Sequence, residues 1–434
     1  MNTTTTWDLS KIQLLFDASK RATALHEQGC YQEALDVSLQ IAHVHPEIAD
    51  AWGNAAANCL RLKRWQDAIR YGQMALARGC GRMELHDVLA HAHASLMQWE
   101  QARPYGFQVL NMRDRLFGGE PVIPLPEPGS MPPLPSGRTR ENNIIAFSLF
   151  GCDLKYCEPA VLNVQEQPHI YPHWVCRFYV DGSVPSSVIA RLRAGGAQIV
   201  PVQGPARQWP GEMWRLLALD DPQAHRILFR DADSVISQRE ARAVEQWLAS
   251  GKRFHMMRDW GSHTELMLAG LWGVVAGSLP PLEQLMQPFM SKPLQSRHFA
   301  DQYFLRQYVW PYARQSLMQH DSVFGFMDAL PFPDGERQEG FQKGFHVGCV
   351  EGSLYFFTFK SDLPDGSEVI WGLFQIQKID NGQTREKLIC AYPGTVKEGI
   401  VKVQHIPQRY ARWLEQGAAV VRLGESGAVR RVHG

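Results

Sequence analysis

The sequence predicts an α+β protein of several domains: a helical repeat region, an α/β domain and a small β-rich appendage. Three observations lead to this prediction. Alanines and aromatic residues recur with a fixed period near the N-terminus, apolar runs alternate with helix-length segments in the middle, and short strand-like runs fill the C-terminal part. At 434 residues the chain is long enough for two or three domains.

The composition narrows the class of protein. The chain is 45% hydrophobic and 20% charged, and its formal net charge is zero, so no overall charge attracts it to nucleic acid or anionic membrane. No secretory leader pattern and no stretch of about 18 uncharged apolar residues occurs. The eight cysteines include no C-x-x-C pair, which favours reduced thiols. We therefore expect a cytoplasmic protein with no nucleic-acid partner and no transmembrane segment.

Residues 15–114 repeat with a period of 34, shown by the aromatics Tyr31, Trp65 and Trp99 (65−31 and 99−65). Two alanine series keep the same step: Ala22, Ala56 and Ala90, and Ala34, Ala68 and Ala102. This period is typical of a helix–turn–helix repeat that buries its apolar face by stacking. The region resembles about three tetratricopeptide repeats. Such repeats usually present a groove for a protein partner or acceptor, and a structural or dimerising role is the alternative.

A connector is predicted at residues 115–140, where proline and glycine are frequent. Such a segment cannot hold a regular helix or a central strand. A domain boundary is therefore expected between the repeats and the segment 141–352.

The segment 141–352 alternates between strand-like and helix-like stretches. The expected strands are "NIIAFSLFG" (143–151), "WVCRFYVDG" (174–182), "AQIVPV" (197–202) and "RILFRDADS" (226–234), and the expected helices lie at 156–168, 185–195 and 211–222. This alternation predicts a parallel sheet flanked by helices. Ligands of such sheets bind beyond the carboxyl ends of the strands, where Asp181, Asp231 and Asp233 fall.

The pair Asp231 and Asp233 suggests a metal site. Two carboxylates spaced i and i+2, leaving a strand on a turn, can converge on one hard cation such as Mg²⁺ or Mn²⁺. That cation would neutralise charge on a diphosphate leaving group, and Arg230 could add positive charge. A solvated turn is the alternative. The apolar strand before the pair and Ser234 after it favour the metal site.

Several ordered motifs carry a family resemblance. They are "NIIAFSLFG", "WVCRFYVDGSVP", "EMWRLLALDDP", "RILFRDADS", "FHMMRDWGSH", "LAGLWGV", "DQYFLRQYVWP" and "QHDSVF". In this order the segment 142–350 resembles bacterial GT-A glycosyltransferases, which use nucleotide-sugar donors. The resemblance implies a Rossmann-like sheet, a UDP- or GDP-sugar donor and Mn²⁺ or Mg²⁺ as cofactor.

The resemblance also implies residue roles on the donor side. Asp231 would contact the nucleotide ribose or a metal-bound water, and Asp233 would bind the cation directly. Asp181 would belong to the nucleoside pocket. Gly270 and Gly273, in "LAGLWG", would form a loop that approaches the donor sugar closely, because glycine has no side chain.

Further roles concern the sugar, the acceptor and the third metal ligand. Arg258 and Asp259 would lie near the sugar, with a structural ion pair as the alternative. Asp301 would lie on the acceptor side or simply cap a helix. An inverting enzyme needs a general base, and Asp259 and Asp301 are the candidates. His320 would be the third metal ligand, with His346 as the alternative, and either could instead be a structural histidine.

The C-terminal residues 353–434 are expected to form a β-rich appendage. Strand-like runs are separated by a turn signal at 380–383 and followed by a short helix at 408–418. This part could shape the acceptor site or complete the core.

Three functions compete at this point. The leading hypothesis is metal-dependent transfer of a sugar from a nucleotide-sugar donor to a protein or glycan acceptor, with the repeats recruiting a partner or acceptor. A D-x-D phosphatase or phosphotransferase would instead use Asp231 as a nucleophile. The third hypothesis is a non-enzymatic repeat scaffold with a degenerate transferase fold.

Overall fold

The computed structural model describes residues 9–119, 122–126, 142–333, 345–352, 355–379, 383–425 and 428–431. The chain divides into two compact units, which are described separately. Unit 1 comprises residues 1–124, 246–268 and 305–346, and unit 2 comprises residues 125–245, 269–304 and 347–434. Of the predicted linker, residues 120–121 and 127–140 lie outside the described residues, and so do residues 380–382 of the predicted turn.

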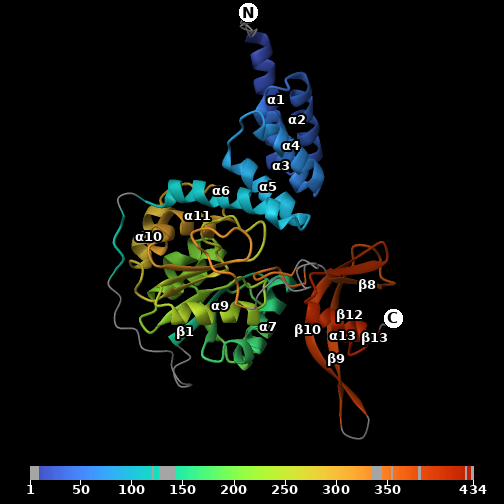
Figure 1. Cartoon of the computed structure of the whole chain (residues 1–434). Coiled ribbons are helices and arrows are strands. Elements are labelled where there is room, and N and C mark those ends of the chain that lie inside the picture. The colour runs from blue at the N-terminus through green and yellow to red at the C-terminus, as the bar shows by residue number, and fades with distance from the viewer. Residues whose placement is uncertain are drawn as a thin grey trace, which may run out of the picture. The chain divides into compact units, whose positions relative to one another are not determined.

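Helical hairpins form the N-terminal part of unit 1 (Figure 1, blue to cyan). The helices are α1 (Leu9–Glu27), α2 (Tyr31–Val44), α3 (Ala49–Arg61), α4 (Trp65–Leu76), α5 (Met83–Ser95) and α6 (Trp99–Phe117). The three periodic aromatics are the first residues of α2, α4 and α6. The periodic alanines Ala34, Ala68 and Ala102 have no exposed surface, so the repeat predicted from the period of 34 is the repeat that the helices form.

The turns inside the hairpins share one backbone feature. Gly29, Lys63 and Met97 each lie two residues before the aromatic that begins the next helix, and their φ angles are 80°, 58° and 60°. Only glycine adopts this left-handed conformation without a steric penalty from Cβ. The second and third turns therefore hold a strained residue where the first has glycine.

The last hairpin packs closely on the remaining segments of unit 1. A Cβ at Gly106 of α6 would lie 2.1 Å from the Phe324 ring, and a Cβ at Gly261 would lie 2.0 Å from Ala94. Thr264 donates a 2.6 Å hydrogen bond to Asp87 of α5. These segments also contain the parallel strands β5 (Phe254–Arg258) and β7 (Leu317–Asp321), a π-helical turn at Leu305–Val309 and α12 (Trp310–Ala313). Hairpin α5–α6 and the segments 246–268 and 305–346 thus share one core.

Unit 2 contains an α/β sheet with strand order β3-β2-β1-β4-β6. Its strands are β1 (Asn143–Leu149), β2 (Val175–Val180), β3 (Gln198–Pro201), β4 (Arg226–Phe229) and β6 (Trp272–Val275). The first four run parallel, as predicted, whereas β6 is antiparallel to β4. The sheet is therefore mixed.

Helices connect and cover these strands. They are α7 (Leu154–Ile170), α8 (Ser186–Ala194), the 3₁₀ helices η2 (Gly204–Gln208) and η3 (Gly211–Asp220), α9 (Gln238–Ala249), α10 (Leu282–Met290) and α11 (Ala300–Phe304). Strand β1 is buried along its whole length, which is expected for a central parallel strand covered on both faces. No helix among the described residues is both long enough and apolar enough to cross a membrane.

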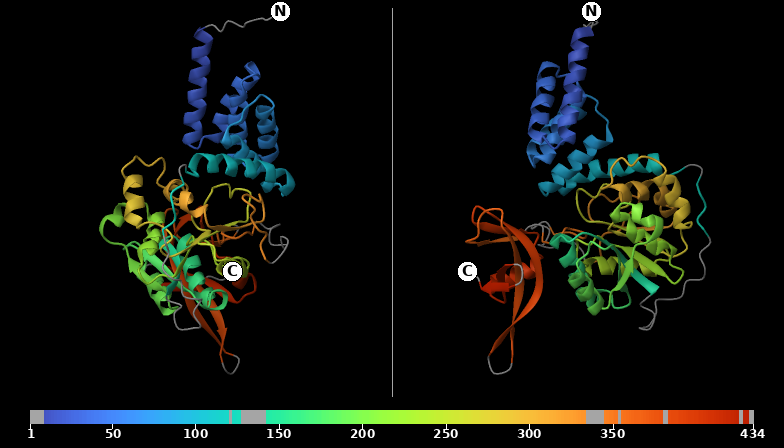
Figure 2. Two further views of the ribbon diagram at one scale, coloured as in Figure 1. Left: turned by 60° about the vertical axis from the view of Figure 1, so that its left-hand side comes forward. Right: turned by 180° about the vertical axis from the view of Figure 1, so that it is seen from behind.

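An antiparallel sheet follows in unit 2, with strand order β13-β12-β9-β10-β11-β8. It curves into a half-barrel around α13 (Gln408–Glu415) (Figure 2, orange and red). Its strands are β8 (Phe356–Lys360), β9 (Glu368–Lys378), β10 (Thr384–Lys397), β11 (Ile400–Gln404), β12 (Ala419–Glu425) and β13 (Ala428–Arg431). Together with the helical hairpins and the α/β sheet, this half-barrel confirms the predicted fold class.

A buried carboxylate links α7 to the half-barrel. Glu158 has no exposed surface and accepts hydrogen bonds from Tyr392 of β10 (2.7 Å) and Tyr410 of α13 (2.9 Å). Arg191 of α8 binds both of its carboxylate oxygens, at 2.6 and 2.8 Å. Because a buried charge needs such partners, Glu158 fixes the half-barrel against the helices of the α/β sheet.

The strained turn yields a stability prediction. Lys63→Gly is expected to raise the free energy of unfolding by about 0.5–1 kcal/mol, because glycine removes the Cβ penalty at φ 58°. Urea unfolding followed by far-UV circular dichroism measures the change. Lys20→Gly, in the exposed interior of α1, is the control and is expected to lower stability by about 1 kcal/mol. An equal loss in both variants would contradict the prediction.

Candidate functional site

The carboxyl ends of β1, β2 and β4 lie at one edge of the α/β sheet, because these strands run parallel. The chain leaves β1 through Gly151, β2 through Asp181 and β4 through Arg230–Asp233. A 2.6 Å hydrogen bond from the Gly151 amide to the Ser183 hydroxyl joins the first two loops. We call this region the carboxyl edge, and it is where ligands of parallel sheets bind.

Asp231 and Asp233 follow β4 at the carboxyl edge. The side chain of Asp231 is 43% exposed and that of Asp233 is 15% exposed, so the couple lies between solvent and core. A Cβ at Gly270 would lie only 2.0 Å from Oδ2 of Asp231. Glycine is therefore required here for close approach to Asp231.

Arg215 of η3 is the arginine that contacts this couple. Its side chain is only 4% exposed, and it binds Asp231 Oδ1 at 2.6 Å and Asp301 Oδ2 at 2.8 Å. It also donates to the Arg230 carbonyl at 2.7 Å. Burial raises the pKa of Asp301, and Arg215 opposes that rise. One buried guanidinium thus holds two carboxylates and the backbone between β4 and the D-x-D couple.

Lys155, in the first turn of α7, faces the other aspartate. Its ammonium lies 3.2 Å from Oδ2 of Asp233. Burial raises the pKa of Asp233, the nearby Asp231 charge raises it further, and Lys155 opposes both effects. The sequence pattern identifies neither Arg215 nor Lys155, because it does not show which basic residues contact the D-x-D couple in the folded chain.

The carboxylates fit a divalent cation that shares its ligands with a substrate. The carboxylate oxygens of Asp231 and Asp233 are of the kind that Mg²⁺ or Mn²⁺ prefers, and both side chains are partly exposed. Among the described residues, no group of three or more His, Cys, Asp and Glu side chains could hold a metal ion. A cation bound by Asp231 and Asp233 would therefore need further oxygens from substrate or water.

Three other predicted residues of unit 2 have protein partners. Asp181 accepts hydrogen bonds from the amide (3.0 Å) and hydroxyl of Ser183, and it lines a cavity of about 560 Å³. Arg230 is 1% exposed and binds Glu240 of α9 at 2.9 Å, not the D-x-D carboxylates. Gly273 lies within β6, opposite Leu228 of β4.

The remaining predicted residues belong to unit 1. Arg258 has no exposed surface and donates to the Gln319 side chain and to the Glu265 carbonyl, and burial lowers its pKa to about 10. Asp259 is equally buried and accepts a hydrogen bond from Ser322. Their roles beside a sugar stay predictions.

Both candidate histidine ligands also lie in unit 1. The Nδ1 atom of His320 lies 2.8 Å from His255 and its Nε2 atom lies 2.9 Å from Gln246, and burial lowers its pKa to about 4. His346 stacks on Trp260, with ring centroids 4.9 Å apart. A metal-binding role for either histidine stays a prediction.

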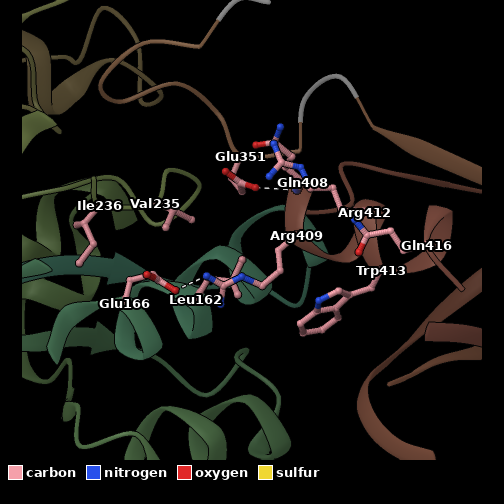
Figure 3. A pocket seen from close by; sticks show the side chains of 10 residues that line it. All are labelled: Leu162, Glu166, Val235, Ile236, Glu351, Gln408, Arg409, Arg412, Trp413 and Gln416. Carbon is pink, nitrogen blue, oxygen red and sulfur yellow. Dashed lines mark hydrogen bonds and ion pairs between the residues drawn. The ribbon is translucent and has the colours of Figure 1, made fainter. Parts of the chain in front are cut away.

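A second cavity, of about 420 Å³, lies in unit 2 beside the loop that follows the D-x-D couple (Figure 3). Its lining comes from α7, that loop, residue 351, α13 and the residue that follows α13. The residues are Leu162, Glu166, Val235, Ile236, Glu351, Gln408, Arg409, Arg412, Trp413 and Gln416. No sequence motif pointed to this cavity.

No family model and no curated protein matches the sequence. Among solved structures, a mutant O-GlcNAc transferase from Thermobaculum terrenum is similar, at 13% identity and a TM-score of 0.27 over 52% of this chain. The chain spans about half of that transferase, with 51% of it covered. A 4-diphosphocytidyl-2C-methyl-D-erythritol synthase from Anaerococcus prevotii has 10% identity and a TM-score of 0.28, over 41% of this chain and 87% of its own. Similarity at this level carries no argument about activity.

The close approach of Gly270 to Asp231 can be tested by adding one methyl group. Gly270→Ala is expected to displace Asp231 from Arg215 and to lower the free energy of unfolding by about 1–3 kcal/mol. Thermal unfolding measures this loss. Gly182→Ala is the matched control, because a Cβ at Gly182 would meet nothing within 4 Å. Equal stability of the two variants would contradict the close approach of Gly270 to Asp231.

Proposed function

We propose that the chain transfers a sugar from a nucleotide-diphosphate donor, a UDP- or GDP-sugar, to an acceptor at the carboxyl edge. The observation that supports this best is the partly exposed D-x-D couple after β4, flanked by Arg215 and Lys155. Such an arrangement suits a ligand that combines a divalent cation with phosphate oxygens.

In this proposal Asp231 and Asp233 hold Mn²⁺ or Mg²⁺, whose chemistry when bound is to neutralise charge on the departing nucleotide diphosphate. Arg215 keeps Asp231 in place through the 2.6 Å contact. Lys155 releases Asp233 and turns its ammonium to a donor phosphate. Asp181 and its cavity belong to the nucleoside side, as its place at the end of β2 suggests.

We propose Asp301 as the carboxylate on the acceptor side. It shares Arg215 with Asp231, so it lies one side chain away from the D-x-D couple. Its raised pKa, caused first by burial, favours proton acceptance from an acceptor hydroxyl in an inverting reaction. Asp259 is the alternative base.

The geometry favours this proposal over a phosphatase with Asp231 as nucleophile. One oxygen of Asp231 is held by Arg215, and the other lies against the backbone of Gly270. A nucleophile needs one oxygen free to move in line toward phosphorus, whereas a metal or ribose ligand can be contacted at the exposed part of a carboxylate that is already held in place.

We also propose that the first helical hairpin, α1 and α2, recruits a protein partner or acceptor. Large apolar side chains are exposed there: Leu14 (69%) and Phe16 (53%) on α1, and Val44 (72%) at the end of α2. Exposed apolar groups on a repeat surface are suited to partner binding.

Removal of one carboxylate charge tests the site. Asp233→Asn is expected to weaken Mn²⁺-dependent binding of UDP or GDP by at least about 100-fold, because it removes the proposed direct ligand. Slow Mn²⁺-dependent release of nucleotide from UDP- or GDP-sugars should be lost as well. Isothermal calorimetry and a nucleotide-release assay measure the two effects.

Asp362→Asn, an exposed aspartate of the same unit, is the control and should leave both quantities unchanged. If the unchanged chain binds no nucleotide with Mn²⁺, the transferase proposal fails. Release of phosphate from simple phosphomonoesters would support the phosphatase instead. Partner binding without either activity would support the scaffold.

Substitution of Lys155 is predicted to change the affinities for Mn²⁺ and for nucleotide diphosphate in opposite directions. Lys155→Met is expected to raise Mn²⁺ affinity without nucleotide by about 2–5-fold, because a competing, partly exposed cation leaves Asp233. With Mn²⁺ present, the same substitution should weaken nucleotide-diphosphate binding by about tenfold, because a charged donor is lost. Calorimetric titrations with Mn²⁺ alone and with UDP or GDP give both numbers.

Lys292→Met, on an exposed residue of unit 2, is the matched control and should change neither affinity. A purely structural role for Lys155 would move both affinities in the same direction or leave both unchanged.

A further inference from the structure

Helix α13 presents one face to the second cavity. Gln408, Arg412 and Gln416 follow one another at steps of four residues, and Arg409 and Trp413 lie beside them on the same face. Figure 3 shows these side chains opposite Glu166 and Leu162 of α7 and opposite Val235 and Ile236. The cavity is thus bounded by α13 on one side and by the α/β sheet domain on the other.

The side chain of Trp413 is held in place by its packing on Tyr410. Tyr410, three residues before Trp413 on α13, donates a 2.9 Å hydrogen bond to the buried Glu158. Trp413 stacks on the Tyr410 ring with centroids 5.3 Å apart and an interplanar angle of 25°. Its indole is therefore oriented before any ligand arrives, which lowers the entropy lost on binding.

The polar groups near the N-terminus of α13 are also fixed. Glu351 accepts a 2.7 Å hydrogen bond from the Gln408 amide, and the Gln408 side chain donates to Tyr355 at 2.9 Å. Arg409 forms an ion pair with Glu166 across the cavity (Figure 3, dashed line). These residues form a polar rim whose side chains are joined by hydrogen bonds and an ion pair.

Three groups facing the cavity keep unused hydrogen-bonding capacity. Arg412, the indole N–H of Trp413 and the Gln416 carboxamide form no side-chain hydrogen bond with any described residue. Arg412 and Gln416 are exposed, and Trp413 is half-buried. A ligand in the cavity would find donors in all three groups and an acceptor in the carboxamide.

The charges of the lining decide the ligand class. Arg409 and Arg412 are balanced by Glu166 and Glu351, so neither a strongly anionic nor a strongly cationic ligand is favoured. An aromatic face, a guanidinium and a carboxamide around a volume of about 420 Å³ suit a neutral ligand with an apolar face and many hydroxyls. A sugar ring has these properties.

The cavity is connected to the D-x-D couple. Val235 and Ile236 follow Asp233 by two and three residues, and the Glu351 amide donates a 2.7 Å hydrogen bond to the Asp233 carbonyl. A ligand that contacts this rim would therefore touch the same loop that carries the couple.

We propose that this cavity binds a neutral carbohydrate segment of the acceptor, with Trp413 stacking on a sugar ring and Arg412 and Gln416 binding its hydroxyls. This inference rests on the proposed sugar transfer at the carboxyl edge and makes the acceptor a glycan. The acceptor chain would extend from the cavity along the loop after β4.

The test uses the full chain and a panel of neutral malto-, cello- and chito-oligosaccharides. Binding to at least one series is expected in calorimetry or saturation-transfer NMR. Trp413→Ala and Arg412→Ala are each expected to weaken that binding by about tenfold or more. Glu415→Ala, an exposed residue of α13 outside the lining, is the matched control and should bind as the unchanged chain does.

Thermal unfolding of each variant separates a binding defect from misfolding, and Gln416→Ala replaces Trp413→Ala if the latter does not fold. Absence of binding to every neutral oligosaccharide at millimolar concentration would overturn the inference. Binding that is unaffected by Arg412→Ala and Gln416→Ala would overturn it too. Nucleotide binding that needs Asp233 is measured on the same samples, so failure of the cavity and failure of the transferase proposal give different results.

Discussion

The contact between the Arg215 guanidinium and the carboxylates of Asp231 and Asp301 is the interaction on which the candidate site depends. Burying a guanidinium whose side chain is only 4% exposed costs free energy, and the two carboxylates offset that cost. The same guanidinium binds the Arg230 carbonyl, so it also fixes the exit of the chain from β4. Arg215 therefore links helix η3, the D-x-D loop and α11. The Asp231 carboxylate that it holds is also the group that the backbone of Gly270 approaches closely.

Helix α7 connects this site to the rest of unit 2 along its length. In its first turn, Lys155 contacts Asp233. In its second turn, Glu158 accepts hydrogen bonds from Tyr392 and Tyr410. Its later turns supply Leu162 and Glu166 to the lining of the second cavity. The D-x-D loop, the half-barrel and the second cavity thus all contact the same helix.

The sequence predicts those features that depend on periodicity and on strand order. The 34-residue step places Tyr31, Trp65 and Trp99 at helix starts, and the apolar run before Asp231 is the buried strand β4. It does not reveal Arg215 or Lys155, because contact across 16 or 78 residues depends on tertiary packing (231−215 and 233−155). Arg230 is a residue for which adjacency in the sequence predicts the wrong partner. Neighbouring residues of an extended segment point in opposite directions, so Arg230 meets Glu240 although it stands next to Asp231 in the chain.

Hairpin α5–α6 has a consequence for the way such a chain can evolve. Both of its helices pack closely on segments that lie far downstream in the same unit: Gly106 of α6 contacts the Phe324 ring, and Ala94 of α5 contacts Gly261. A gene rearrangement that exchanged or deleted this last hairpin would remove the surface against which those segments pack. A change in the number of repeats is therefore compatible with this packing only where α5 and α6 stay next to those segments.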